Sequence, residues 1–289
     1  MRERIIFLNG DYLAESEAKL SVLDRGLLFA DAVYEGFGLL DGQIVDFIYH
    51  IRRLERSLRE LSIPMTFSVD EIFSDLMKLI QKNNAKSGFL YLHVTRGAGD
   101  RAFHYHDQYL PNIFAFIQGE KFAADDTPPA IDLLTYPDLR WARRDIKSTN
   151  LLAQVMAKQA AHQAGAYEAL MVDMNGLVTE AGSSSFFFIK DDSLYVRPIS
   201  REILHGITRQ TMLRVAEDRG ISIVERTYSL GEVLAADEAL ITASSTYILP
   251  VRKIDGNVIG NGKAGPFTLA LREGYLVKAR SEFYRPKPS

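Results

Sequence analysis

A lysine in a basic stretch is the first residue whose type and setting could do chemistry. Lys147 follows Arg143 and Arg144 and directly precedes a segment of helical character. Neighbouring positive charges lower the pKa of a lysine, and an amine with a lowered pKa is a nucleophile. The alternative is an ordinary solvated lysine on a basic loop, as most lysines are. The residues alone leave both interpretations open.

A carboxylate at the end of an expected strand is the second candidate. Glu180 closes the run 177–180 and is followed by Ala181, Gly182 and the three serines 183–185. A carboxylate that leaves a strand into a turn of small residues can point into a cavity, where the serines offer hydroxyl groups and close backbone approach. A surface turn explains the same pattern equally well.

Three further features could bind an anion. Residues 206–209, Gly-Ile-Thr-Arg, open an expected helix, and free backbone N–H groups at a helix start favour negative charge, although most helix starts are simply capped. A hydroxyl cluster at 244–246 follows an expected strand and could share the same anion. Arg53 lies at the expected start of another helix, where it either binds a phosphate through its guanidinium fork or stays on the helix surface.

The composition excludes several classes of protein. The chain has 289 residues, a formal net charge of −3 and no cysteine, which rules out disulfides, thiolate metal sites and a cysteine nucleophile. The near-neutral charge gives no basic surface of the kind that binds nucleic acid. No Walker loop occurs, which argues against a common NTPase, and no HExxH motif occurs, so we expect no metal site. No apolar run reaches the roughly 20 residues that span a bilayer, and the first residues contain no apolar signal segment. The sequence therefore predicts a cytoplasmic globular protein.

The hydrophobic pattern predicts an α+β, or mixed α/β, fold in two domains. Alternating runs bounded by turn dipeptides predict strands, and a 3.6-residue period predicts helices. Residues 121–130 have the composition of a linker, which sets domain limits at 1–120 and 131–289. Strands are expected at 5–9, 32–40, 44–47, 89–95, 113–117, 131–136, 168–173, 177–179, 185–190 and 193–197. The turn dipeptide Asn175-Gly176 predicts a hairpin between the strands at 168–173 and 177–179. Helices are expected from 54, at 69–83 and 150–165, after 206 and at 265–282.

Taken together and in this order, the motifs resemble those of the fold type IV aminotransferases, which use pyridoxal 5′-phosphate (PLP). The resemblance covers nearly the whole chain and rests on residues 50–54, 145–148, 178–180, 206–209 and the serine cluster before Pro250. Within that family it is nearest to the D-amino acid aminotransferases, on residues 92–97, 140–141, 157–159 and 167–169. It implies a small N-terminal α/β domain and a larger, β-barrel-like C-terminal domain that binds PLP.

The resemblance also implies a role for each matching residue at the cofactor. Lys147 corresponds to the lysine that forms a Schiff base with PLP, and Glu180 to the partner of the pyridine nitrogen. Leu204 corresponds to a leucine that backs the ring. The residues that correspond to the phosphate site are Arg53, Ile207, Thr208, Ser244 and Ser245.

On the substrate side the match is closer at some positions than at others. Tyr34 corresponds to a tyrosine that faces the substrate, and Arg101 to an arginine that binds the substrate carboxylate in the site of a partner subunit, which implies a homodimer with shared active sites. The D-amino acid enzymes carry a histidine two residues after that arginine, whereas this chain has Phe103 with His104 beside it. Residues 35–37, Glu-Gly-Phe, are typical of branched-chain and amine transaminases.

The implied reaction is transfer of an amino group from a D-amino acid, such as D-alanine or D-glutamate, to a 2-oxo acid such as 2-oxoglutarate. The same fold serves branched-chain L-amino acid aminotransferases, (R)-amine transaminases and aminodeoxychorismate lyase. Arg101 favours an amino acid over a simple amine, because a guanidinium fork suits a carboxylate. A PLP-binding carrier without turnover is the alternative from another class, and the presence of both Lys147 and Tyr34 argues against it.

Overall fold

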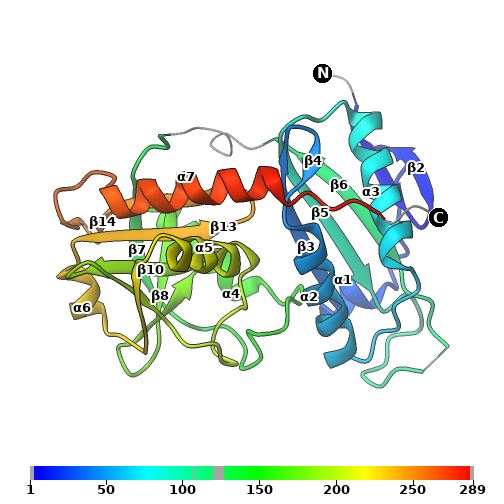
Figure 1. Cartoon of the computed structure of the whole chain (residues 1–289). Coiled ribbons are helices and arrows are strands. Elements are labelled where there is room, and N and C mark those ends of the chain that lie inside the picture. Colours follow the sequence, from blue (N-terminus) through cyan, green and yellow to red (C-terminus); the bar gives the residue numbers. More distant parts are fainter. Residues whose placement is uncertain (1–2, 107, 120–126, 287–289) are drawn as a thin grey trace. The chain divides into compact units, whose positions relative to one another are not determined.

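The computed structural model describes residues 3–106, 108–119 and 127–286, which form two compact units (Figure 1). The first unit comprises residues 1–123 together with 146–150 and 282–289, and the second comprises 124–145 and 151–281. Lys147 therefore belongs to the first unit, although it follows the expected linker in sequence. The linker at 121–130 falls largely on residues outside the described ranges, so the domain limits 1–120 and 131–289 stay a prediction.

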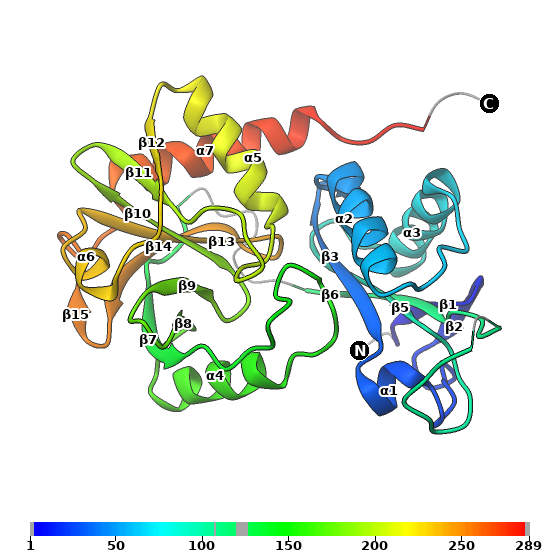
Figure 2. The same cartoon turned by 90° about the horizontal axis from the view of Figure 1, so that it is seen from below.

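The first unit is built on an antiparallel sheet of six strands in its described residues, with the order β2-β1-β6-β5-β3-β4. Two helices, α2 and α3, cover one face of this sheet (Figure 2). Strand β3 pairs with β5 along its length, and Tyr34 lies opposite His93. The elements are β1 (Ile5–Leu8), β2 (Asp11–Ala14), α1 (Arg25–Phe29), β3 (Ala32–Leu40), β4 (Gln43–Ile44), α2 (Phe47–Glu60), α3 (Val69–Asn83), β5 (Gly88–Thr95) and β6 (Ile113–Gln118).

The start of α2 corrects one expectation. The strand expected at 44–47 ends at Ile44, and the helix begins at Phe47 rather than near residue 54. The reason is that Phe47 and Ile51 continue the buried stripe of Leu54 and Leu58 toward the N-terminus, at helical spacing. Arg53 therefore lies in the middle of a helix, with its side chain on the buried face.

The second unit contains a curled mixed sheet with the order β12-β11-β10-β13-β14-β7-β8-β9, and β15 pairs with β14. Its interior is filled by buried aliphatic and aromatic side chains such as Leu170, Phe186, Phe188 and Leu249. Helix α4 packs on β7 and β8, whereas α5 and α7 pack on each other and on β13. The elements are β7 (Ile131–Pro137), α4 (Leu152–Gln163), β8 (Glu168–Val172), β9 (Val178–Ala181), β10 (Ser185–Lys190), β11 (Ser193–Val196), α5 (Ile207–Asp218), β12 (Ser222–Glu225), α6 (Leu230–Leu234), β13 (Glu238–Ala243), β14 (Tyr247–Ile254), β15 (Asn257–Val258) and α7 (Pro266–Ser281).

The α+β fold class is confirmed by this arrangement of a small antiparallel sheet and a curled mixed sheet with helices. The hairpin expected at Asn175-Gly176 joins β8 to β9, and Gly176 has the left-handed φ of 76° that its turn requires. Among the described residues, no helix is both long and apolar enough to cross a membrane.

Candidate active site

Lys147 lies against Tyr34 within the first unit. Its Nζ is 4.2 Å from the centre of the Tyr34 ring, and the Tyr34 backbone N–H donates to the Lys147 carbonyl oxygen at 3.0 Å. The Lys147 backbone N–H in turn donates to Ser57 Oγ on α2 at 3.3 Å. In the described part of the chain, no carboxylate pairs with Lys147 Nζ. The backbone of Lys147 is thus fixed by hydrogen bonds, while the side-chain amine is left available for chemistry.

Arg53 belongs to a buried charged cluster on the same unit. It donates to the Glu35 carboxylate from Nε at 2.8 Å and from Nη2 at 2.7 Å. His50 Nδ1 lies 2.7 Å from the same carboxylate, one helical turn before Arg53. Burial alone would raise the pKa of Glu35, but Arg53 and His50 lower it to about 2, while burial lowers the pKa of His50. Glu35 is therefore ionised at neutral pH and fixes the orientation of Arg53.

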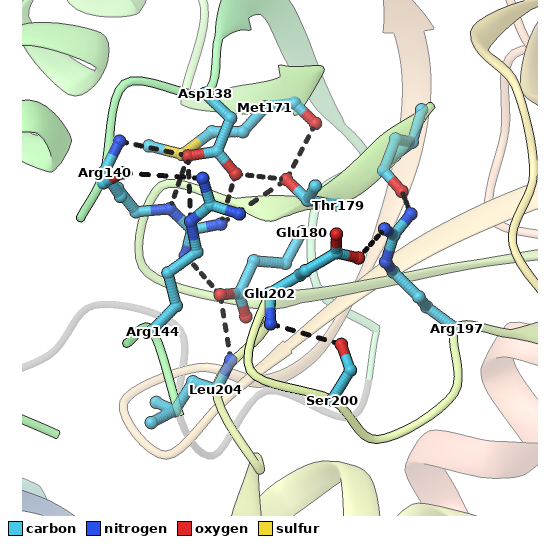
Figure 3. Close-up of polar contacts among 11 residues, drawn as sticks. Asp138, Arg140, Arg144, Met171, Thr179, Glu180, Arg197, Ser200, Glu202 and Leu204 are labelled. Atoms are coloured by element: carbon cyan, nitrogen blue, oxygen red, sulfur yellow. Dashed lines mark hydrogen bonds and ion pairs between the residues drawn. The ribbon is translucent and has the colours of Figure 1, made fainter. Parts of the chain in front are cut away.

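Glu180 is the centre of a polar network in the second unit, shown in Figure 3. Its Oε1 accepts hydrogen bonds from Arg140 Nη1 and, at 3.0 Å, from the Leu204 backbone N–H. Arg140 in turn donates hydrogen bonds from Nε and Nη2 to the Asp138 carboxylate, which also accepts a hydrogen bond from Thr179 Oγ1 at 2.7 Å. Arg140 therefore cannot rotate away from Glu180 without breaking its bonds to Asp138.

The other oxygen of Glu180, Oε2, accepts no hydrogen bond from the described residues, although the side chain is buried. Burial raises the pKa of Glu180, whereas the Arg140 guanidinium and the Leu204 N–H favour the charged carboxylate. Such a carboxylate, with one oxygen fixed and one free, is suited to accept a hydrogen bond from a protonated ring nitrogen.

The two hydroxyl-rich motifs of the second unit lie on adjoining elements. Helix α5 begins after Gly206 without a side-chain cap, so its first N–H groups are available to an anion. A Cβ on Gly206 would lie 2.6 Å from Ser185 Oγ, and Ser185 pairs with Thr242 in the sheet, just before the 244–246 cluster. Thr242 Oγ1 is buried and has no hydrogen-bond partner within the described residues. Gly206 thus packs closely on Ser185, and the unsatisfied hydroxyl of Thr242 lies on the strand residue paired with Ser185.

Arg101 lies on an irregular loop of the first unit. It is exposed, and its guanidinium lies 5.4 Å from the centre of the Phe29 ring and 5.6 Å from that of Phe103. Tyr34, Arg53, Arg101 and Lys147 thus belong to the first unit. The remaining candidates, which belong to the second unit, are Glu180, Leu204, Ile207, Thr208, Ser244 and Ser245.

The sequence pattern did not point to the partners that orient these candidates. Asp138 and Arg140 form the support of Glu180, and Glu35 and His50 form that of Arg53. The only local signal was the spacing of His50 and Arg53, which places both side chains on one face of a helix. Arg53 is 18 positions from Glu35 and Arg140 is 40 positions from Glu180, and no local pattern reveals contacts over such separations.

Comparison with known proteins gives the class of this protein. The family described as amino-transferase class IV matches residues 32–254, which include Lys147, Glu180 and the start of α5. The chain belongs to the class IV aminotransferase family, as its sequence resemblance predicted. The D-alanine aminotransferase of Staphylococcus haemolyticus is 36% identical over 279 residues, which cover 96% of this chain and 99% of that protein. That of Bacillus licheniformis is 37% identical, with 91% and 93% covered.

Solved structures show the same fold. The branched-chain amino acid aminotransferase of Escherichia coli superposes with a TM-score of 0.90 at 24% identity, covering 98% of this chain and 97% of that one. The PLP-form of the branched-chain amino acid aminotransferase from Thermobaculum terrenum superposes with a TM-score of 0.84 at 24% identity, covering 96% and 94%. Both agree with a small antiparallel sheet followed by a curled mixed sheet.

Proposed function

We propose that this aminotransferase moves the amino group of a D-amino acid, of the D-alanine or D-glutamate type, to a 2-oxo acid such as 2-oxoglutarate, with PLP as cofactor. The observation that carries the reaction type is Lys147, an anchored lysine whose Nζ has no carboxylate partner among the described residues. The substrate follows from the relatives, which are D-alanine aminotransferases matched along nearly their whole length.

The residues present fit PLP. Glu180 Oε2, which has no partner among the described residues, offers an acceptor for the pyridine nitrogen. Leu204 is held beside Glu180 by the hydrogen bond from its own N–H. The start of α5, with Ile207 and Thr208, offers N–H groups and a hydroxyl to the phosphate, together with Ser244 and Ser245. When bound, PLP supplies an electron sink for the electron pair left on the α-carbon of the amino acid.

The remaining steps fall to side chains of this protein. Lys147 Nζ acts as the base that takes the proton from the α-carbon of the amino donor. Glu180 holds a proton on the pyridine nitrogen, and Arg140 and Asp138 keep the carboxylate in place. Tyr34, stacked at 5.3 Å on Tyr91, lines the side on which the substrate binds.

Arg53 provides a test of the phosphate site. Replacing it by methionine is expected to weaken PLP binding by about 10- to 100-fold, because a charge-assisted hydrogen bond contributes roughly 1.5–3 kcal/mol. Titration of the apoprotein with PLP measures this change. Arg52→Met is the matched control, since Arg52 is the exposed neighbour on the same helix.

The same substitution leaves the buried Glu35 carboxylate with less compensating charge, which by itself destabilises the unit. The double variant Arg53→Met/Glu35→Gln removes that charge, so its PLP affinity reports the phosphate contact alone. Unchanged PLP affinity in the double variant would refute a phosphate role and leave Arg53 as a structural partner of Glu35.

We also propose that the active form is a homodimer in which Arg101 binds the substrate carboxylate in the partner subunit's site. Arg101 is exposed, and large apolar side chains around its loop and helix α1 are exposed too: Leu27 by 72%, Phe103 by 81% and Leu110 by 81%. Exposed apolar groups that gather in this way are typical of a surface that is covered in an assembly. A guanidinium fork is a suitable partner for a carboxylate.

Arg101→Ala is expected to raise KM for D-alanine by about 10- to 100-fold, because one charge-assisted contact to the carboxylate is lost. For a substrate without a carboxylate, such as (R)-1-phenylethylamine, kcat/KM is expected to change little. Steady-state kinetics on both substrates measure the difference. An equal loss on both substrates would exclude a carboxylate role.

Subunit hybrids test the shared site. Lys147→Ala and Arg101→Ala chains with different affinity tags are co-expressed, and the mixed dimer is purified. If Arg101 acts across the dimer, one of the two sites has both residues intact, and the hybrid has about half of the wild-type activity. If the hybrid is no more active than the Arg101→Ala chain alone, Arg101 acts in its own subunit's site. A monomer with full activity would refute the dimer.

The proposed function itself is tested by measuring the 2-oxo acid that each amino donor leaves when 2-oxoglutarate is the acceptor: pyruvate from D-alanine or L-alanine, and 4-methyl-2-oxopentanoate from L-leucine. Turnover of D-alanine well above that of either L-amino acid is expected. Turnover of L-leucine with none of D-alanine would identify a branched-chain L-amino acid aminotransferase instead.

A further inference from the structure

The loop that carries Arg101 is attached to the first unit by a buried arginine. Arg25, the first residue of α1, is only 3% exposed. Its Nη1 donates to the carbonyl oxygens of Ala102 at 2.6 Å and His104 at 3.4 Å, and its Nη2 donates to that of Phe103 at 3.2 Å. One guanidinium thus binds three consecutive backbone carbonyls, and these directly follow Arg101.

The guanidinium of Arg25 is itself held by a second set of contacts. Its Nε donates to Asp31 Oδ2 at 2.9 Å, and the rings of Phe29 and Tyr105 lie 4.7 Å and 5.8 Å from its central carbon. Asp31 also pairs with Arg96, from Nε at 2.7 Å and from Nη2 at 3.0 Å. Because Asp31 directly precedes β3, this network joins the loop to the strand that carries Tyr34.

These contacts of Arg25 depend on its guanidinium group, which is planar and holds five N–H donors in fixed directions. Carbonyl oxygens that are bound from one side fix the direction of the backbone, and so fix where the preceding side chain points. Arg101 itself is exposed and has only ring contacts to Phe29 and Phe103 among the described residues. Its position therefore depends on the backbone that follows it.

We propose that Arg25 is a positioning residue for substrate recognition, which holds residues 102–104 so that Arg101 is presented to the substrate carboxylate. This rests on the proposed function, in which Arg101 binds that carboxylate. Arg25 does not touch substrate and acts only through Arg101. Removing the fork lets the loop move, so that carboxylate binding weakens while the chemistry at Lys147 is unaffected.

The test uses Arg25→Lys and Arg25→Met in the PLP-loaded enzyme. Arg25→Met is expected to raise KM for D-alanine about tenfold with kcat within about twofold, as for the loss of roughly one charge-assisted hydrogen bond. Arg25→Lys keeps the charge but lacks the fork, so an intermediate KM is expected. Ile72→Val, in the core of α3 of the same unit, is the control for a general loss of stability, and its KM is expected to stay unchanged.

Two further measurements separate positioning from a structural role. Amide hydrogen exchange at residues 102–105 is expected to speed up about tenfold or more in Arg25→Met but not in Ile72→Val. In an Arg101→Ala background, Arg25→Met is expected to have no additional effect on KM, because the two residues act in series. Unchanged exchange in the loop would overturn the proposal. The proposal would also be overturned if Arg25→Met raised KM as much in the Arg101→Ala background as it does in the wild-type enzyme.

Turnover of D-alanine by the wild-type enzyme tests the proposed function independently of the role of Arg25. If the wild-type enzyme fails to turn over D-alanine, the proposed function is wrong. The exchange measurement still decides whether Arg25 holds the loop, because it needs no substrate.

Discussion

Lys147→Ala is expected to lower turnover of the PLP-loaded enzyme by at least about 10⁴-fold, the upper range for a residue that transfers a proton in the transition state. No second amine is positioned to replace it in the described part of the first unit, where Lys147 is the lysine that lies on the Tyr34 ring. The fold is expected to survive, because the anchoring contacts of Lys147 are made by its backbone. Single-turnover kinetics and the thermal unfolding midpoint together measure both effects.

Lys158→Ala is the matched control for this experiment. Lys158 is paired with Glu168 at 2.9 Å and with Ser183 Oγ at 2.9 Å, so it is a structural lysine, and its loss is expected to leave turnover within a few-fold. Borohydride treatment of the PLP-loaded enzyme followed by peptide mapping is expected to leave the phosphopyridoxyl label on Lys147. A label on Lys158 or Lys190 would contradict the role of Lys147.

Glu180→Gln has the second largest expected effect. An amide can still accept the hydrogen bonds from Arg140 and the Leu204 N–H, so PLP is expected to stay bound. It cannot stabilise a positive charge on the pyridine nitrogen, and the loss of such a preorganised electrostatic group costs about 10²- to 10³-fold in rate. The rate of α-proton removal from D-alanine, followed by the cofactor spectrum, measures this effect.

Glu202→Gln is a suitable control, because Glu202 is a neighbouring glutamate whose partner is Arg197 rather than Arg140 (Figure 3). Its replacement is expected to leave the rate within about twofold, as for a partly exposed ion pair. If Glu180→Gln removed the α-proton at the wild-type rate, Glu180 would have no part in stabilising the ring charge.

The candidate residues for chemistry could be found in the sequence more readily than the residues that support them. Lys147 and Glu180 stand in local motifs, at a basic stretch and at a strand end, and such motifs are visible in one sequence. Arg140 reaches Glu180 across 40 positions, and Arg53 reaches Glu35 across 18. These contacts form only when the sheets have formed, so no local periodicity or turn motif in the sequence predicts them.

The elements themselves show the same limit. Helices α5 and α7 and the hairpin at Asn175-Gly176 were expected, because a glycine or a turn dipeptide marks their ends. The start of α2 was misplaced because Phe47 and Ile51 suit a strand as well as a helix. The burial of both side chains, with Phe47 packed on Phe73 of α3, decides between the two. The return of residues 146–150 to the first unit depends on backbone contacts with β3, which local sequence does not specify.

The central claim is that this aminotransferase acts on D-amino acids through Lys147, and the half-reaction tests it most directly. The PLP-loaded enzyme is mixed in separate experiments with D-alanine, L-alanine, L-leucine and (R)-1-phenylethylamine, without any 2-oxo acid, and the visible absorption of the bound cofactor is followed. D-alanine is expected to bleach this absorption rapidly in the wild-type enzyme and not at all in Lys147→Ala, with L-alanine and L-leucine slower by about 100-fold or more. Rapid bleaching by L-leucine or by the amine, with D-alanine inert, would contradict the claim.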